Sequence, residues 1–433
     1  MVSDQKSTRI GSSGQVVGVM LLIVGLYFPT STNGEHSLLC VLVAFAILLS
    51  LFGYLTWNFG TRFGAAVSIS LPMIIVLLGC TFSLLFNGPF QFDWGMFTKF
   101  SALALLLALD LRKFNAGTWV KAAFVLANSI NIAFGFAILI GSEWVSGFLS
   151  RYYWSFYPEL LPEMLRLHKP VLTLGTHASA GLFLYLFFWV NWEAYKVSRS
   201  LLAFAFAFSH VVLLVGLSSF SSLGFGLLAL TQMGAWLWKH ERKLLTTTAL
   251  CGMVLFAIVL RQFSNEIDVL RNSPELGTKV LNSNISGPLA RYGPGGSSRK
   301  AIDYLIDHPL SPIGFGTPPY LAGGSTALGD SGPLEYLLRG SLPLLALMYF
   351  GLYRFLRFNL TSRHHALLLF LVIVAFETGF SLLIYVRTLY LLPFLVVFLR
   401  HIESVQTTQR ALAGAPLMPS VLGQRGVRAE GQI

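Results

Sequence analysis

The sequence predicts an all-α polytopic membrane protein with about 12 transmembrane helices, and three observations lead to this prediction. First, 55% of the 433 residues are hydrophobic and only 11% are charged, with a mean hydropathy of +0.67. A soluble chain would need roughly twice that charge to cover its surface. Second, the apolar runs are about twenty residues long, which is the length that crosses a bilayer as a helix. Third, the alternating runs of about ten residues that a membrane barrel requires are missing.

The membrane segments follow from a hydropathy window of about 19 residues. The polar stretch 1–14 precedes the first segment and lacks the small-residue cleavage site of a signal peptide, so we expect an uncleaved first helix. The expected segments are 15–29, 37–57, 63–86, 97–110, 118–142, 171–191, 200–217, 220–238, 244–263, 333–353, 365–385 and 387–400. The fourth and twelfth are short, so a count of about ten or eleven also fits. A tail, 401–433, follows the last segment.

Lys and Arg in the short connections predict the orientation, because positive charge near helix ends is retained in the cytoplasm. The connections 29–36, 87–96 and 216–219 contain neither Lys nor Arg. The alternate connections are basic, with Lys6 and Arg9, Arg62, Arg112 and Lys113, Lys196 and Arg199, Lys239 with Arg242 and Lys243, Arg354 with Arg357 and Arg363, and Arg400 onward. This alternation predicts that both termini are cytoplasmic.

Two connections are too long to be simple turns, and both fall on the predicted outer face. The first, 143–170, is rich in aromatic residues and leucine. It fits either an interfacial helix whose rings lie at headgroup level or a groove that binds lipid or sugar. The second, 264–331, contains many Gly, Pro and Ser together with five Lys or Arg residues. A long outer loop is where a membrane enzyme would keep its chemistry.

Topology explains only part of the net charge of +11. On the predicted topology 18 of the 30 Lys and Arg residues are cytoplasmic, as the positive-inside rule requires. The other 12 lie on or near the outer face, where that rule requires none. This location excludes nucleic acid as a partner. The expected anion is a lipid headgroup, a diphosphate or an acidic sugar.

Motifs of soluble enzymes are missing from the sequence. It contains no GxxxxGK[ST], no GxGxxG after a strand, no HExxH, and no Cys or His cluster with metal-ligand spacing. Cys40, Cys80 and Cys251 all lie inside apolar runs, so they indicate neither a disulfide framework nor a thiolate metal site. We therefore expect no nucleotide, metal or other cofactor.

One block in the second long connection is distinctive. From Ser298 it reads S-R-K-A-I-D-Y-L-I-D-H-P-L-S-P-I-G-F-G, and from Gly329 it continues as G-D-S-G-P-L-E-Y-L-L-R-G. This block resembles the O-antigen polymerase and ligase family of bacterial cell envelopes, the Wzy-type polysaccharide polymerases and their ligase relatives. The resemblance covers 298–340 and rests on Arg299, His308, Pro309, Gly314, Gly316, Asp330, Ser331, Leu334 and Gly340.

Two departures from the family pattern limit what the resemblance implies. Family members usually have an Arg in a turn that opens an earlier helix, and the corresponding stretch 216–226 has none. That anion contact is therefore either absent or supplied from elsewhere, for example by Arg291. The ligase branch typically has a His-Asn-like pair where this chain has Asp330 and Ser331. The second difference favours a polymerase over a ligase.

The resemblance implies a glycosyltransferase of the bacterial inner membrane that joins polyprenyl-diphosphate-linked oligosaccharide repeat units on the outer, periplasmic face. The glycosyl diphosphate is already activated, so the reaction needs a cationic site for the leaving diphosphate and a base for the acceptor proton. Arg299, Arg291, Lys300 and Arg339 are the expected diphosphate ligands, and Asp330 or His308 the expected base. A flippase and a chain-length regulator of the same pathway are the expected partners, besides membrane lipid.

Each of these residues also has an ordinary structural interpretation. Arg299, Arg291 and Lys300 could be solvated loop residues. His308 could cap a turn, and Asp330 could be the N-cap of the helix that starts near 333.

Ionisable groups inside the membrane segments are functional candidates because they are costly to bury. Glu335 and Arg339 are spaced i, i+4 and could form a structural ion pair. His177 could be an ordinary hydrogen-bonded core histidine. Glu377 and Arg387 could pair with each other or with Arg339.

Two other classes of function compete with the enzyme. A transporter, such as a flippase of the same lipid-linked units, should show two related halves and charges near the bilayer midplane. The sequence shows no internal repeat, and its charges gather toward one face. A scaffold protein would leave the block 298–340 without a purpose.

Overall fold

The computed structural model shows an almost entirely helical chain. It describes residues 4–29, 37–59, 61–86, 91–114, 117–153, 160–246, 297–307, 312–317, 331–379 and 381–414, with a few separate residues between 249 and 268. Within this part of the chain the only strands are β1 (Gln91–Phe92) and β2 (Gly316–Thr317), which pair antiparallel. The predicted all-α class is therefore confirmed. The predicted segment 244–263 lies largely outside the described residues.

Every other predicted apolar segment coincides with a helix. These helices are α1 (Asp4–Tyr27), α2 (Ser37–Phe59), α3 (Phe63–Ala65) continued by η1 (Ala66–Ser70) and α4 (Leu71–Phe86), α5 (Trp94–Ala108), α6 (Gly117–Leu139), α9 (His177–Ser198), α10 (Leu201–Gly216), α11 (Phe220–His240), α16 (Gly332–Asn359), α17 (Arg363–Glu377) and α18 (Val386–Gly414). Helix α17 ends at Glu377 rather than at 385, because Thr378 and Gly379 form a turn. Helix α18 continues into the predicted tail.

The two long connections contain short helices. The aromatic connection 143–170 contains α7 (Glu143–Tyr152) and α8 (Leu160–Arg166). Outside these two connections, a short helical turn, η2 (Leu111–Lys113), follows α5. In α7, Val145 and Leu149 are buried whereas Trp144 is exposed, as expected for an interfacial helix. The second connection contains α15 (Ser297–Asp307) and β2.

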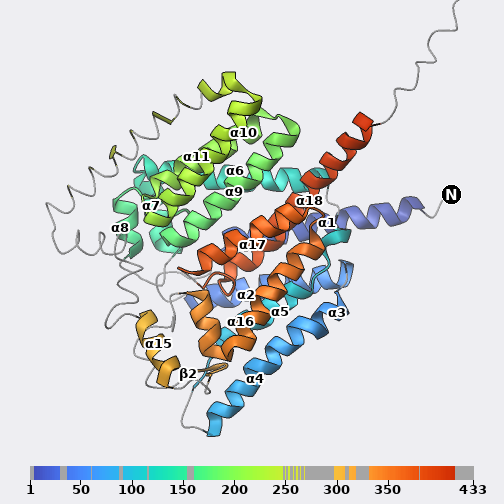
Figure 1. Ribbon diagram of the computed structural model, residues 1–433, viewed down its shortest axis with the longest axis vertical. Coiled ribbons are helices and arrows are strands. Elements are labelled where there is room, and N and C mark those ends of the chain that lie inside the picture. The colour runs from blue at the N-terminus through green and yellow to red at the C-terminus, as the bar shows by residue number, and fades with distance from the viewer. Residues whose placement is uncertain are drawn as a thin grey trace, which may run out of the picture.

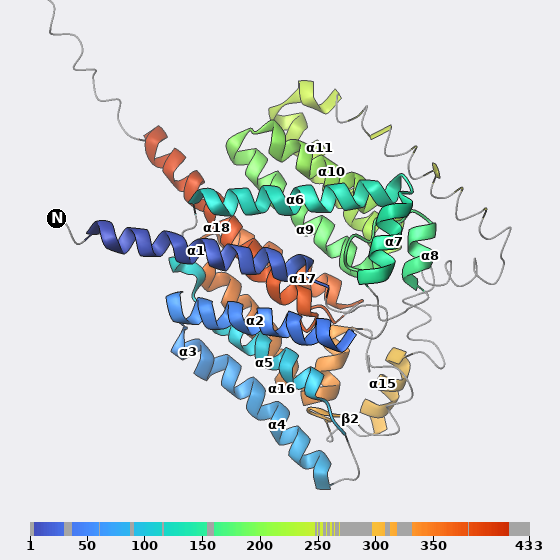
Figure 2. The same ribbon diagram turned by 180° about the vertical axis from the view of Figure 1, so that it is seen from behind.

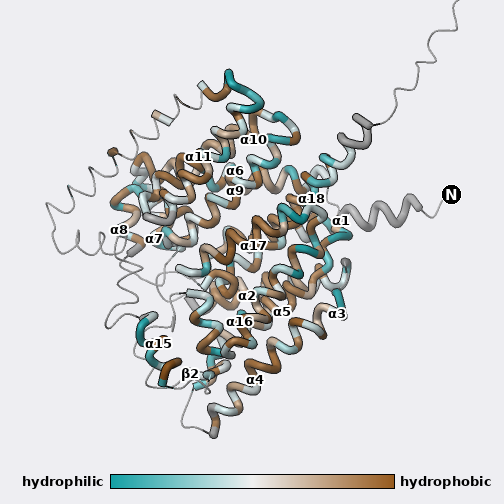
Figure 3. The backbone as a smooth tube through the Cα atoms, viewed as in Figure 1, coloured by the Kyte–Doolittle hydropathy of each residue, from teal (hydrophilic) through white to brown (hydrophobic). Residues whose placement is uncertain are grey.

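Four of the described helical stretches are long and apolar enough to cross a membrane: Leu39–Asn58, Phe63–Ser83, Gly117–Leu139 and Val386–Thr408. Figure 3 shows apolar residues along much of the bundle, whereas α15 is largely hydrophilic. Large apolar side chains such as Leu42, Leu49 and Ile75 are exposed on the outside of α2 and α4, as expected for a surface that faces lipid. The chain is therefore an all-α membrane protein.

The helices α9 and α18 form the centre of the bundle. Every residue from 179 to 193 in α9 and from 386 to 399 in α18 is buried. The two ends of the bundle differ (Figures 1 and 2). The N-terminus of α1 and the C-terminus of α18 lie at one end, which we call the terminal face. Helices α7, α8 and α15 and strand β2 lie at the other end, which we call the loop face.

A kink in α16 shapes the loop face. The backbone of Gly340 and Ser341 is not helical, and Pro343 lacks the N–H that would bond the carbonyl of residue 339. The segment 312–317 supplies the missing donors, because Ile313 and Gly314 donate to the carbonyls of residues 338 and 339 at 2.9 and 2.8 Å. The G-F-G turn of the matched block is thereby attached to α16.

Gly314 is required at this attachment, and we expect Gly314→Ala to lower the thermal midpoint of the detergent-solubilised protein clearly. Gly314 has φ +55, which alone costs other residues about 1–2 kcal/mol. An added Cβ would also lie 2.4 Å from the carbonyl oxygen of Leu77 and 2.5 Å from the backbone nitrogen of Thr81. Gly147→Ala is the control, since its Cβ would meet nothing within 4 Å and Ala favours the helix. Equal midpoints for both variants would contradict this requirement.

Candidate functional site

Three of the predicted site residues, Arg291, His308 and Asp330, lie outside the described residues. Arg299 and Lys300 are described, and both lie exposed on α15. Arg299 Nε donates to Asp303 Oδ1 at 2.8 Å, one helical turn away. An exposed pair of this kind contributes little to stability, so the guanidinium could exchange that partner for another anion.

Helix α15 is held on α16 by a small apolar cluster. Ala301 and Tyr304 on α15 are buried together with Ile313, Leu334 and Leu338. The basic side of α15 therefore remains at the surface of the loop face, above the N-terminal half of α16.

Arg339 is fully buried and its charge is compensated. Its Nε donates to Glu335 Oε1 at 2.5 Å, its Nη1 donates to the Gly314 carbonyl at 2.8 Å, and its Nη2 lies 3.4 Å from Asp93 Oδ2. Asp93 also caps α5 by accepting from Met96 N at 2.9 Å. These contacts match the predicted Glu335–Arg339 ion pair and join α5, α16 and the segment 312–317.

Glu377 is fully buried at the end of α17. Its Oε1 accepts from Tyr336 Oη at 2.5 Å and from Leu383 N at 2.9 Å. Tyr349 lies close enough to interact electrostatically with this carboxylate, but Glu377 Oε2 has no partner in hydrogen-bond geometry within the described part of the chain. A Cβ on Gly332 would lie 2.7 Å from Glu377 Cδ, so the carboxyl group packs against the first residue of α16, two positions after Asp330.

Arg387 is the second buried arginine, and its surroundings are neutral. Its Nη1 donates to both the carbonyl and Oγ1 of Thr173, the latter at 2.8 Å, and its Nη2 lies 3.4 Å from the Phe28 carbonyl. Its guanidinium carbon lies 5.2 Å from the centre of the Tyr153 ring. Arg387 Nε is buried without a hydrogen-bond partner, and no carboxylate of the described residues lies within ion-pair distance.

The predicted pairing of Arg387 with Glu377, one of the possibilities for these residues, is therefore not what the structure shows. Both side chains are described, and each has the other partners given above. The physical reason is that Thr378 and Gly379 form a turn after α17, and the Leu383 N–H donates to Glu377 Oε1. Arg387 reaches toward the connection before α9 instead.

That connection carries two more polar side chains. His177 is the first residue of α9, and Thr176 caps the helix by accepting from Ser179 N at 3.3 Å. Lys169 is completely buried in the same connection, where His168 and Leu172 have positive φ. His177 is partly exposed and follows, in the same connection, the Thr173 that binds Arg387.

Sequence reasoning missed several of these groups. Asp93 and Lys99 lie at the start of α5, and Lys99 is within electrostatic range of Arg339, Glu335 and Asp93. A lysine near the predicted outer face, against the positive-inside rule, was the available signal for both Lys99 and Lys169. Nothing in the local sequence distinguishes Thr173, because its role depends on a residue 214 positions away.

The chemistry that these groups support is anion binding at Arg387 and proton transfer at Glu377. Arg387 offers an uncompensated cation with an unused N–H, and Glu377 offers an unused carboxylate oxygen. The described His, Cys, Asp and Glu residues do not gather in a geometry that could hold a metal ion. Comparison with known proteins found no matching family model, no matching curated protein and no matching solved structure.

Proposed function

We propose that this protein is a polysaccharide polymerase of the bacterial inner membrane. It joins polyprenyl-diphosphate-linked oligosaccharide repeat units at the loop face, which would be the periplasmic side of a bundle of about 12 membrane-spanning helices. The product would be an exopolysaccharide or an O-antigen.

The observation that carries this proposal is the neutral environment of Arg387. A guanidinium buried in a membrane protein is costly unless an anion accompanies it, and here the described partners are carbonyls, one hydroxyl and one aromatic ring. The Phe28 carbonyl at the end of α1 adds only a partial negative charge. A diphosphate would supply the missing negative charge, and the planar fork of arginine can bind two of its oxygens.

The reaction needs no cofactor. The bond between the anomeric carbon of the growing chain and its lipid diphosphate breaks, and that carbon forms a new bond to a hydroxyl of the incoming repeat unit. Arg387 and Arg299 hold the leaving lipid diphosphate. The hydroxyl proton passes to a carboxylate, for which Asp330 and Glu377 are the candidates at the N-terminus of α16.

Two other functions would use the same chemistry. An O-antigen ligase would transfer the finished chain from the same lipid diphosphate to a different acceptor. A flippase would move the lipid-linked unit without breaking a bond. Helices α7, α8 and α15 lie at the loop face, whereas the chain ends lie at the terminal face, and this asymmetry favours an enzyme acting at one side.

A strain that lacks the protein separates these functions. Absence of polymer, with single repeat units accumulated on the outer side, indicates a polymerase. Long polymer retained on the lipid carrier indicates a ligase, and repeat units confined to the cytoplasmic side indicate a flippase. The last two outcomes would overturn the proposal.

The resemblance gives its own prediction for Asp330. Asp330→Asn should reduce polymer by about 100-fold if the carboxylate is the base, because asparagine cannot take up a proton. The expected capping role of Asp330 is wrong, because Ser331 caps α16 by accepting from Leu334 N at 3.4 Å, so a loss of polymer in Asp330→Asn would not come from a lost cap. Polymer length on gels and membrane abundance of the variant are the measurements. Normal polymer from Asp330→Asn would exclude Asp330 as the base and leave Glu377 as the candidate. Glu377→Gln is the matching test of that residue.

A further inference from the structure

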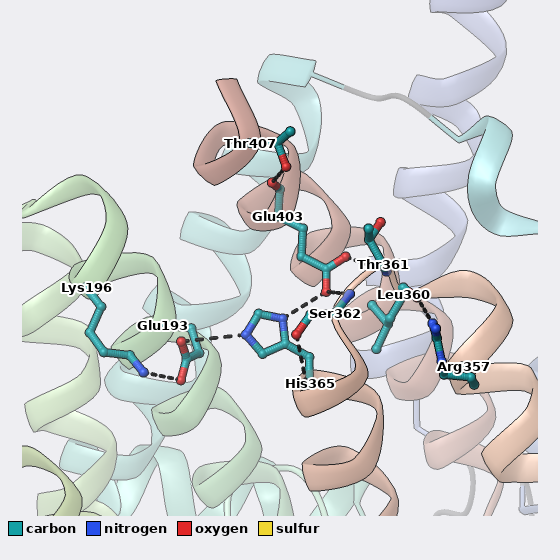
Figure 4. A network of polar contacts seen from close by, with 9 residues as sticks. All are labelled: Glu193, Lys196, Arg357, Leu360, Thr361, Ser362, His365, Glu403 and Thr407. Carbon is teal, nitrogen blue, oxygen red and sulfur yellow. Dashed lines mark hydrogen bonds and ion pairs between the residues drawn. The ribbon is translucent and has the colours of Figure 1, made fainter. Parts of the chain in front are cut away.

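At the terminal face, His365 lies between two buried carboxylates from different helices (Figure 4). Its Nδ1 is 2.9 Å from Oε1 of Glu403 on α18, and its Nε2 is 3.7 Å from Oε2 of Glu193 on α9. His365 itself belongs to the first turn of α17. We call Glu193, His365 and Glu403 the terminal clasp, since they join α9, α17 and α18.

The clasp also fixes the start of α17. The carboxylate of Glu403 accepts from the backbone N–H groups of Thr361 and Ser362 at 2.7 and 3.0 Å. These donors precede the helix and would otherwise need water or another acceptor. Glu403 therefore binds both the backbone and the imidazole of this segment from α18.

The geometry favours a charged imidazole. A neutral imidazole has one N–H, so one of its two nitrogens would turn a lone pair toward a carboxylate. An imidazolium presents an N–H to each. The direct ion pairs agree, because Lys196 Nζ, 2.5 Å from Glu193 Oε1, is paired with only one of the two carboxylates.

One further cation, Arg400, lies near the clasp without forming an ion pair with Glu403. Arg400 on α18 interacts electrostatically with Glu403, but its Nη1 donates to the Leu111 carbonyl at 2.6 Å. On α17 the neighbouring ring is His364, 6.2 Å away. From α9, besides Glu193 and Lys196, the Trp189 ring meets His365 edge-on at 5.9 Å.

Each helix of the clasp carries a candidate site residue at its opposite end. At about 1.5 Å per residue, the clasp and those residues are about 18–24 Å apart along each helix. The pairs are Glu193 and His177 on α9, His365 and Glu377 on α17, and Glu403 and Arg387 on α18. A shift of any of the three helices at the terminal face would therefore move one of these residues at the loop face.

We propose that an imidazolium at His365 holds the terminal clasp and thereby sets the register of α9, α17 and α18, making the clasp a proton-dependent positioning device for the loop face. Loss of the proton in alkaline conditions would leave two carboxylates facing a neutral ring and loosen the junction. The effect on polymer formation rests on the proposed function, whereas the charge of His365 does not.

The charge of His365 can be measured directly in the detergent-solubilised protein with isotopically labelled histidine. At about pH 8.5 an ordinary imidazole is neutral. Among the nine histidines we expect one doubly protonated ring at this pH, and its signal should change in Glu193→Gln. A folded protein in which every ring is neutral at that pH would overturn the proposal.

The positioning role is tested by the pH dependence of polymer formation in membrane vesicles supplied with lipid-linked repeat units. Glu193→Gln keeps the shape of the side chain but removes one carboxylate that favours the imidazolium. We expect the loss of activity in alkaline buffer to occur about one pH unit lower than in the wild type. His364→Gln, which exchanges the neighbouring exposed histidine, should leave the profile unchanged.

The outcomes separate the two proposals. Vesicles of the wild type that form no polymer would contradict the proposed function, while the histidine signals would still decide the charge of the clasp. An active Glu193→Gln variant with an unchanged alkaline limb would show that the clasp does not position the site. For stability, we expect His365→Gln to lower the thermal midpoint by about 5 °C. Adding Glu193→Gln to this variant should restore the midpoint.

Discussion

Arg387→Gln is expected to reduce polymer by about 100-fold or more while the protein stays at its normal membrane abundance. Glutamine removes the positive charge that would stabilise the leaving diphosphate. It leaves no described carboxylate unpaired, because the described partners of Arg387 are neutral groups of Thr173, Phe28 and Tyr153. Removing the charge relieves the cost of burying an unpaired cation, which offsets the hydrogen bonds that are lost to Thr173 and Phe28. Substitution of Arg387 should therefore reduce polymer formation without reducing the stability of the protein.

Two variants sharpen the test of Arg387. Arg387→Lys keeps the charge but loses the fork that binds two oxygens, so polymer should fall by about ten-fold. Arg363→Gln removes a charge from the exposed start of α17 and should leave polymer unchanged. Polymer of normal length and amount from Arg387→Gln would exclude Arg387 from diphosphate binding and remove the main support for the proposed function.

The helices could be predicted from the sequence because their signal is local. In hydrocarbon, an apolar run such as 37–57 can satisfy its own backbone hydrogen bonds only as a helix, and α2 closely matches this run. The end of α17 was predicted less well, since Ser381 to Tyr385 are apolar enough on average to extend the segment. There the turn at Thr378 and Gly379 and the capture of the Leu383 N–H by Glu377 decide the boundary.

The candidate site could be predicted only where its partners are close in sequence. Glu335 and Arg339 are one helical turn apart, so their ion pair followed from spacing alone. Arg387 and Thr173 are 214 positions apart, and Glu403 and His365 are 38 positions apart on different helices. Contacts of this kind depend on which helices become neighbours, which hydropathy does not specify.

The attachment of the G-F-G turn also lay beyond sequence reasoning. The sequence singled out Gly314 only as part of the matched block. The need for glycine at this position comes from contacts with residues that are distant in the sequence. It has a positive φ, approaches Leu77 and donates to a carbonyl that Pro343 leaves free. Gly340, which also belongs to the matched block, lies at the same kink, where its backbone is not helical.

Arg339→Met is expected to destabilise the protein by about 3–5 kcal/mol, in contrast to substitutions of Arg387. It would leave Glu335, which is 1% exposed, as a buried carboxylate without its cation, and the Gly314 carbonyl without its donor. Membrane abundance and the thermal midpoint in detergent should both fall. The polymer should fall in proportion to the remaining protein, because Arg339 has no charge left for substrate after pairing with Glu335 and Asp93.

The second-site variant Arg339→Met with Glu335→Gln decides between a structural and a substrate role for Arg339. Glutamine is neutral, so the double variant no longer buries an unpaired charge at position 335, and it should recover at least about half of the lost stability. Polymer per molecule should then be close to that of the wild type. If the double variant is stable and abundant but makes no polymer, Arg339 binds substrate despite its two carboxylate partners, and the site extends from Arg387 to the kink of α16.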